Sequence, residues 1–328
     1  MQSESLVYSN ARVKSLENSF LSQEKINRMV YADSLDEAVR VLLESNYGNG
    51  IVASAFDFDL ILNAEEQKLN DFMSENTIPK MGLETFLVKN DYHNAKAICK
   101  AKYMHSDDVS YMVAPEGKIS IDYLQEKIFN DTYDSLPKPM AQALSKIDND
   151  RVMGDTNPSS IDIALDKAMY EDILDSLKSS KAASIKQYWQ ANIDFGNISL
   201  FIRYKKIGFS QKQFESSLFD GGKLDKNLFV SYYDQVADSF IEKLKYTCYE
   251  KLVNTIDLNN LVSFETECDN YLLNIFKENK QDVFSVAPLA GFYVAKKMEI
   301  KVCRMILILK KNKIDSNIIK QRLRDYYA

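Results

Sequence analysis

The amino-acid sequence predicts an all-α protein. Glycine and proline, the residues that most often form turns, number only 10 and 6 among 328 residues, well below the roughly 7 and 5 per cent of average usage. Leu, Lys, Glu and Ala, which favour helices, are abundant. The sequence also lacks the regular alternation of polar and apolar residues that marks strands. These observations predict long helices and few hairpins.

Helix signals are dense in the first half of the chain. Ser34 and Glu37 form an S-x-x-E capping box ahead of apolar residues at helical spacing, which predicts a helix start. The break around Pro79 separates two long helices. We expect helices over residues 34–46, 54–76, 81–104, 119–130 and 136–149.

The second half repeats the order of long and short helices. Pro158 stands at the favoured first position of a long helix that begins near Asn157. We expect further helices over residues 182–207, 210–218, 224–234, 236–250, 255–278, 286–310 and 314–326.

This order reflects a sequence repeat. DYHNAKAICKAK from Asp91 aligns with DFGNISLFIRYK from Asp194 and with EIKVCRMILILK from Glu299, at offsets of 103 and 105 residues. Positions 0, 3, 7 and 11 of these segments recur and lie on one face of a helix. We call this face the stripe. Its members are Asp91, Asn94, Ile98 and Lys102, then Asp194, Asn197, Phe201 and Lys205, then Glu299, Val302, Ile306 and Lys310.

Two further matches extend the repeat. Gly117 and Gly222 align at an offset of 105 residues, and FLSQEKINRM at Phe20 is similar to FSQKQFESSL at Phe209. The chain thus begins late in one unit and ends early in another. We therefore expect three similar helical units around a pseudo-threefold axis. Their boundaries are 1–114, 115–219 and 220–328, with N-terminal helices packing near the C-terminal element.

The stripe admits two interpretations. Its polar residues either join helices within each unit, where Lys stems and Asn side chains find partners, or face a common axis and line a polar socket for a partner protein. Under the second interpretation the candidate partner-binding residues are Asp91, Asn94, Lys102, Asp194, Asn197, Lys205, Glu299, Arg304 and Lys310.

Both histidines of the chain lie near one cysteine, which raises the question of a metal site. Cys99 follows His93 by six residues, so the two side chains point to opposite sides of a helix. The repeat replaces His93, Cys99 and His105 by unrelated residues in the other units. Nucleotide-binding, protease and EF-hand motifs are missing as well. We expect no catalytic, cofactor-binding or metal-binding residues, and surface or packing roles for the histidines.

Charge and apolar runs exclude other classes. A formal net charge of −6 gives no basic footprint for nucleic acid. The four cysteines are widely spaced and fit reduced core thiols. The least polar run, residues 283–295, is much shorter than the roughly 20 residues that span a bilayer. We expect a soluble protein that is peripheral to the membrane at most.

The segments NPSSIDIALDKAMYEDIL, NDYHNAKAICKAK, IDFGNISLFIRYKKIGFS and PLAGFYVAKKMEIKVCRMILILKKNKIDSNIIKQRLRDYYA resemble the C subunit of bacterial and archaeal V/A-type rotary ATPases, whose eukaryotic counterpart is the d subunit of the V-ATPase. The resemblance implies a three-unit helical funnel, present once per complex, on the cytoplasmic end of the membrane proteolipid ring. It implies that the funnel receives the tip of the central shaft and couples shaft to ring for ion transport. It also implies no catalytic residues and no cofactor.

The chain departs from its own pattern at two positions. Val302 replaces the stripe Asn in the third unit, and Ser199 replaces the basic residue found at Lys96 and Arg304. Both changes argue against three equal contacts to a symmetric partner. The competing class is a free-standing helical-repeat scaffold that binds proteins, but a period near 105 residues far exceeds the roughly 34 to 47 residues of such repeats.

Overall fold

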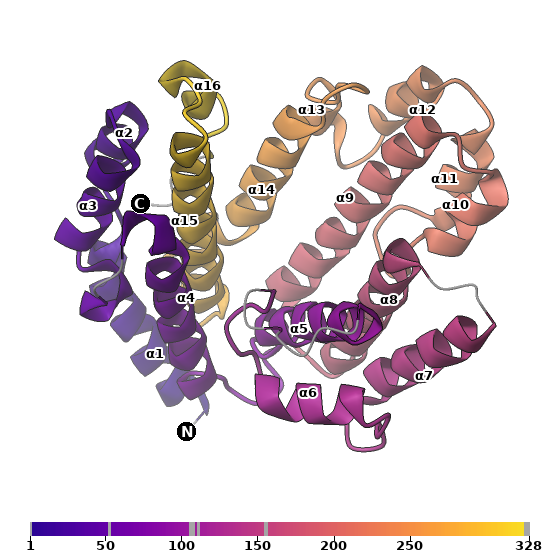
Figure 1. Cartoon of the computed structure of the whole chain (residues 1–328), viewed down its shortest axis with the longest axis horizontal. Coiled ribbons are helices and arrows are strands. Elements are labelled where there is room, and N and C mark those ends of the chain that lie inside the picture. The colour runs from indigo at the N-terminus through magenta and orange to yellow at the C-terminus, as the bar shows by residue number, and fades with distance from the viewer. Residues whose placement is uncertain (1, 52–53, 105–108, 110–111, 154–156, 325–328) are drawn as a thin grey trace. The chain divides into compact units, whose positions relative to one another are not determined.

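The computed structural model describes residues 2–51, 54–104, 109, 112–153 and 157–324, and the regular elements over these residues are all helices (Figure 1). The all-α prediction is confirmed. The chain forms two compact bodies. We call Pro79–Val253 the central body, and we call Met1–Ile78 with Asn254–Ala328 the terminal body because it holds both ends of the chain. The three predicted units and their axis stay a prediction.

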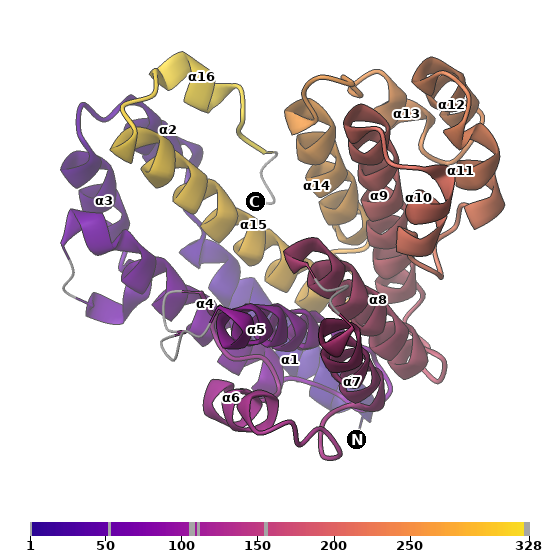
Figure 2. The ribbon, with the colours of Figure 1, turned by 45° about the vertical axis from the view of Figure 1, so that its right-hand side comes forward.

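The terminal body is organised around one long helix near the C-terminus, α15. Helices α1 to α4 from the start of the chain pack on it, as does α14, and Figures 1 and 2 show α15 in yellow beside the indigo and purple helices. The helices of this body are α1 (Gln2–Leu16), α2 (Gln23–Tyr31), α3 (Leu35–Glu44), α4 (Phe58–Glu75), α14 (Val262–Lys277), α15 (Ala287–Lys311) and α16 (Ser316–Lys320).

Apolar burial joins the two ends of the chain. Cys303, Ile306 and Leu307 of α15 share one core with Val30 of α2 and Leu42 of α3, and all five are fully buried. Burial of apolar surface is the main favourable term in folding, about 25 cal/mol per Å². The start of the chain is therefore an integral part of the fold around α15.

The central body consists of the helices between these two ends. Helix α8 contacts both α5 and α9, while α6 packs on α5 and α7 packs on α8 (Figure 2). Its helices are α5 (Thr85–Tyr103), α6 (Ile121–Phe129), α7 (Lys138–Val152), α8 (Pro158–Leu177), α9 (Ala183–Ile207), α10 (Gln211–Ser217), α11 (Lys226–Tyr233), α12 (Ala237–Leu244) and α13 (Glu250–Val253).

The two helix starts predicted from capping residues are present. The Ser34 hydroxyl accepts from the Glu37 amide (3.2 Å), while the Glu37 carboxylate accepts from the Asp33 amide (2.9 Å), one residue earlier than a standard capping box requires. Asn157 and Ser160 cap α8 reciprocally, with Pro158 as its first residue.

Three expectations about helices were wrong or incomplete. The helix expected over 236–250 ends at Leu244, and α13 begins only at Glu250, because the Thr247 hydroxyl donates to the Leu244 carbonyl and accepts from the Tyr249 amide in the intervening turn. The helix over 314–326 ends at Lys320. Helices α1 and α2 had no counterpart among the expected ranges.

Candidate functional site

The first acid of the stripe is buried and fixes a loop. Asp91 Oδ1 accepts hydrogen bonds from the backbone amides of Lys118 (2.9 Å) and Ile119 (3.0 Å). These two residues directly precede Ser120, the N-cap residue of α6. The carboxyl group of α5 therefore sets where the following short helix begins.

The second acid repeats this contact. Asp194 accepts from the amides of Lys223 (2.8 Å) and Leu224 (3.2 Å), which directly precede the N-cap residue of α11. It also accepts from the Tyr249 hydroxyl (2.7 Å). Asp194 is fully buried. Two long helices of the central body thus hold the start of a short helix in the same way.

The repeated glycines allow these close contacts. A Cβ atom on Gly117 would lie 2.4 Å from Asp91 Oδ1 and 2.4 Å from the backbone oxygen of Leu87, and one on Gly222 would lie 2.0 Å from Asp194 Oδ1. A side chain at either position would collide with the acid. Each glycine therefore recurs in the sequence together with the acid that it faces.

The third acid makes the equivalent contact across almost the whole chain. Glu299 Oε2 accepts from the amide of Leu21 (2.6 Å), which directly precedes the N-cap residue of α2, and its Oε1 accepts from the Tyr47 hydroxyl (2.5 Å). The start of α2 is therefore bound by α15 in the same way as the start of α6 is bound by α5 and the start of α11 by α9. The alignment of Phe20 with Phe209 paired α2 with α10 instead, and these hydrogen bonds correct it.

The stripe lysines bind the opposite ends of the same short helices. Each lysine donates to a carbonyl oxygen at the C-terminal end of α6, α11 or α2, where carbonyls lack helical partners and a cation is favourable. The three bonds are Lys102 to Ile128 (2.8 Å), Lys205 to Tyr233 (2.6 Å) and Lys310 to Ala32 (2.8 Å). Acid and lysine together hold both ends of one short helix against one long helix.

The stripe asparagines add a third contact in the central body. Asn94 both donates to the Ala114 carbonyl (3.2 Å) and accepts from the Ala114 amide (2.8 Å). Asn197 makes the same pair of bonds to Phe219 (3.0 and 2.9 Å). Val302, which replaces the asparagine in α15, has no side-chain hydrogen-bonding group, so this pair of bonds is limited to two of the three copies.

The nine candidate partner-binding residues all have such contacts within their own body. Arg304, the one candidate outside the stripe, pairs with Asp59 and donates to Asn63 Oδ1 (2.9 Å). These contacts support the interpretation that the stripe joins helices. A direct contact of the stripe with a partner protein stays a prediction.

Burial shifts the titration of the acids in the central body. Removal from water raises the pKa of Asp91 to about 7, although the two backbone amides oppose this shift. Burial likewise raises the pKa of Asp194 from its ordinary value, against the hydrogen bonds from Tyr249 and the loop amides. The protonation of both carboxyls is therefore linked to folding.

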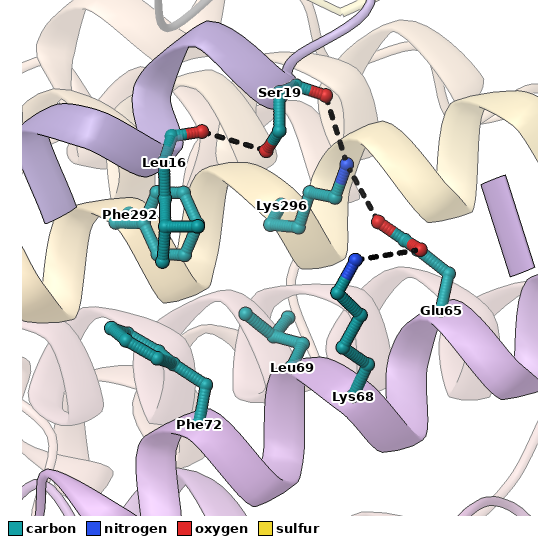
Figure 3. A pocket seen from close by; sticks show the side chains of 8 residues that line it. All are labelled: Leu16, Ser19, Glu65, Lys68, Leu69, Phe72, Phe292 and Lys296. Atoms are coloured by element: carbon teal, nitrogen blue, oxygen red, sulfur yellow. Dashed lines mark hydrogen bonds and ion pairs between the residues drawn. The ribbon is translucent and has the colours of Figure 1, made fainter. Parts of the chain in front are cut away.

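The third acid of the stripe, Glu299, belongs to a buried ionic cluster. Lys296 Nζ lies 2.7 Å from Glu299 Oε1, 3.1 Å from Glu65 Oε1 and 3.4 Å from the Ser19 carbonyl, and only 3% of Lys296 is exposed. Figure 3 shows Lys296 directed between Ser19 and Glu65, with Lys68 reaching the same Glu65 carboxylate. A buried cation thus accompanies two buried carboxylates here.

A small pocket adjoins this cluster. Leu16, Phe72 and Phe292 line its apolar side, and its volume is about 70 Å³ (Figure 3). Small-molecule sites are usually several hundred Å³. The pocket is therefore too small for an organic cofactor.

The central body carries a much larger hollow, a groove of about 1020 Å³ between α5, α8 and α9. The sequence reasoning did not identify it. The available signal was the spacing of four basic or titratable residues, at intervals of four, three and four, on one side of α5. These residues are Lys89, His93, Lys96 and Lys100.

His93 is exposed on the wall of this groove, while Cys99 is buried. His105 lies outside the described residues. Across the part of the chain that the structure describes, no three His, Cys, Asp or Glu side chains gather as metal ligands. Within the same part, none of the helices combines the length and apolar character needed to cross a bilayer.

Comparison with known proteins gives one family along nearly the whole chain. Residues 9–322 match the family model described as ATP synthase (C/AC39) subunit. The C subunit of the V-type sodium ATPase of Enterococcus hirae is 22% identical, over 97% of this chain and 98% of its own. The C subunits of the A-type ATP synthases of Methanococcoides burtonii and Methanocaldococcus jannaschii are also 22% identical, over 98% and 94% of this chain and 94% and 83% of theirs.

Proposed function

Because the chain belongs to the ATP synthase (C/AC39) subunit family, and is thus a subunit of a V/A-type rotary ATPase, we propose that it is a non-catalytic subunit of the central stalk. In this role it connects the rotating shaft to the membrane proteolipid ring for ion transport. It acts as a single copy, peripheral to the membrane on its cytoplasmic face.

The observation that carries this proposal is the extent of the family match. It spans residues 9–322, and the Enterococcus hirae relative is covered along 98% of its length. A match to part of a chain would fit a borrowed domain in an unrelated protein. A match from end to end supports the same place in the same kind of assembly.

The contacts of the stripe support a mechanical role. A part that transmits torque must resist bending, and each long helix with a stripe is bonded to both ends of a short helix through groups far apart on its surface. Packed helical interiors are also nearly incompressible. This architecture suits a rigid connector.

We further propose that three similar units surround a pseudo-threefold axis and form a funnel, with boundaries at 1–114, 115–219 and 220–328. Support for the threefold order comes from the three equivalent sets of acid and lysine contacts, at Asp91 and Lys102, Asp194 and Lys205, and Glu299 and Lys310. Each set joins the long helix of one unit to a short helix of the next unit. The packing of α2 and α3 on α15 supports the expected interleaving of the chain ends.

A reconstitution experiment tests the coupling role. Membrane vesicles bearing the rotary ATPase are stripped of this subunit, and ATP hydrolysis and ATP-driven ion uptake are measured before and after the purified chain is returned. We expect the stripped complex to hydrolyse ATP without ion uptake, and the returned chain to restore uptake. Ion uptake that is unchanged in vesicles lacking the subunit contradicts the proposal.

A further inference from the structure

The three acid contacts differ in how far other groups compensate the buried carboxyl. Glu299 has a backbone amide, a tyrosine hydroxyl and the Lys296 cation as partners. Asp194 has two amides and the Tyr249 hydroxyl. Asp91 has only its two amides: among the residues that the structure describes, no hydroxyl or side-chain cation is bonded to its carboxyl group. The contact at Asp91 is therefore the least compensated of the three.

Charged groups on the neighbouring elements leave this carboxyl poorly balanced. Helices α6 and α8 pack on α5, and the charged groups that act on Asp91 from these sides are Lys118, ahead of α6, and Asp172 of α8. Asp172 accepts from the hydroxyl of Tyr92, the next residue of α5 (3.3 Å). Lys118 is exposed, so water screens its attraction. An ionised Asp91 is thus a buried charge with a second carboxyl on the facing helix.

The ionised form of Asp91 is costly inside the fold, because a buried charge needs a partner of opposite sign. Protonation removes the cost, and so does entry of water when the segment before α6 moves away from α5. Burial raises the pKa of Asp91 to about 7, which places the change between the two forms near neutral pH. The other end of α6 is bound separately, by Lys102 at the Ile128 carbonyl (2.8 Å). Movement at the start of α6 is therefore local.

We propose that the contact of Asp91 with the start of α6, which lies beside α5 in Figure 2, is a pH-sensitive hinge. It stays closed when Asp91 is protonated, and it opens locally far more often when Asp91 is ionised, because water then reaches the carboxylate. The amides of Lys118 and Ile119 lose their acceptor in the open state. The inference needs only the isolated chain and stands apart from the proposed function. In a subunit that transmits torque, the same hinge makes the central body less rigid as pH rises.

Hydrogen exchange of single backbone amides measures this opening directly. The full-length chain is exchanged between about pH 5 and about pH 8, and the rates are corrected for the intrinsic effect of pH. Since the pKa of Asp91 is about 7 when buried against an ordinary 3.8, we expect the protection of the Lys118 and Ile119 amides to fall at least about tenfold from pH 5 to pH 7 and then to level off. The Leu21 amide, bound by Glu299 beside Lys296, should change less than about threefold. Protection of Lys118 and Ile119 that does not fall over this range overturns the proposal.

A substitution assigns the effect to Asp91. Asp91→Asn keeps an acceptor for the two amides but has no group to ionise, so their protection should no longer depend on pH. Asp238→Asn makes the same change in charge at an exposed position of α12 and should keep the fall seen in the wild-type chain. A fall of the same size in Asp91→Asn refutes the hinge. The comparison with the Leu21 amide uses the wild-type chain alone, so it decides the question even where Asp91→Asn does not fold.

Discussion

Lys310 Nζ lies 2.8 Å from the carbonyl oxygen of Ala32, so the stripe of α15 binds the end of α2, which lies 278 residues earlier in the sequence. The equivalent lysines, Lys102 and Lys205, reach carbonyls only 26 and 28 residues away. The same contact thus occurs three times. The first two copies join helices that are close in sequence, whereas the third joins helices from opposite ends of the chain.

Replacement of the third lysine should weaken the terminal body. Lys310→Met keeps the length of the side chain but leaves the Ala32 carbonyl without this donor, so we expect a loss of roughly 1–3 kcal/mol in the free energy of unfolding. Urea denaturation followed by circular dichroism measures it. Lys313→Met, at an exposed residue of the same segment, is the control. Equal stability of both variants means that the contact does not stabilise the fold.

The glycine that faces Asp194 offers a test by double substitution. Gly222→Ala should destabilise the chain by roughly 1–3 kcal/mol because the added methyl group collides with the carboxylate. Removal of that carboxylate relieves the collision, since the nearest groups are all side-chain atoms. Asp194→Ala/Gly222→Ala should therefore cost less than the sum of the two single variants.

The matched pair at the first stripe should behave differently. A methyl group on Gly117 also meets the Leu87 backbone oxygen at 2.4 Å, which no side-chain substitution removes. Asp91→Ala/Gly117→Ala should therefore recover less of the stability lost through the glycine substitution than Asp194→Ala/Gly222→Ala does. Additive costs at both pairs, from urea denaturation, would show that the acids do not set the requirement for glycine.

Asp91 should give stability a specific dependence on pH. Its pKa is about 7 in the folded chain against an ordinary 3.8, so between these values the folded state binds more protons than the unfolded state. Stability from this group is then present at low pH and is lost as pH rises from about 4 to 7. Asp91→Asn keeps an acceptor for the loop amides but has no carboxyl to ionise. It should therefore lack this decrease in the free energy of unfolding, which is on the order of 1–4 kcal/mol.

The comparison across pH isolates this group from its neighbours. Lys118 and Asp172, which influence the same carboxyl, are present in both proteins. The difference in the free energy of unfolding between wild type and Asp91→Asn, measured by urea denaturation, should therefore change between about pH 4 and pH 7. A constant difference over this range contradicts burial as the dominant effect on Asp91.

Lys296 should be the most sensitive residue of the terminal body. Lys296→Met leaves the buried carboxylate of Glu299 without its cation and leaves Glu65 with only the more distant Lys68, at 4.0 Å. Loss of one partner from a buried ionic cluster costs roughly 3–5 kcal/mol. Lys296→Met/Glu65→Gln removes one of the two charges and should be more stable than the single variant in thermal denaturation. A double variant that is less stable than Lys296→Met would refute charge burial as the cause.

Much of this fold follows from sequence. Low glycine and proline content predicted the all-α class, and the stripe predicted the three equivalent long helices, because residues at offsets 0, 3, 7 and 11 share one helical face. The recurrence of an acid, an apolar residue and a lysine was visible without any structure. The partners of that acid were not, because they are backbone amides, which every residue but proline carries.

Other features depended on distant packing. The match of FLSQEKINRM at Phe20 predicted N-terminal helices near the C-terminal element, but it did not indicate the bond between the Leu21 amide and Glu299, because that contact arises only when the two ends of the chain meet. The groove was missed because its basic wall lies on the side of α5 away from the stripe. The helix expected over 236–250 ends at Leu244, since Thr247 is compatible with a helix by propensity, while its hydroxyl stabilises a turn here.

The central claim is that this chain joins two other parts of a rotary ATPase, and affinity purification from native membranes tests it most directly. The tagged chain is isolated in mild detergent at low and at high salt, and the bound proteins are identified by mass spectrometry. We predict recovery of shaft and proteolipid subunits, with less of both at high salt because contacts between charged surfaces are screened. Recovery of neither, from membranes that contain an intact rotary ATPase, would contradict the proposed role.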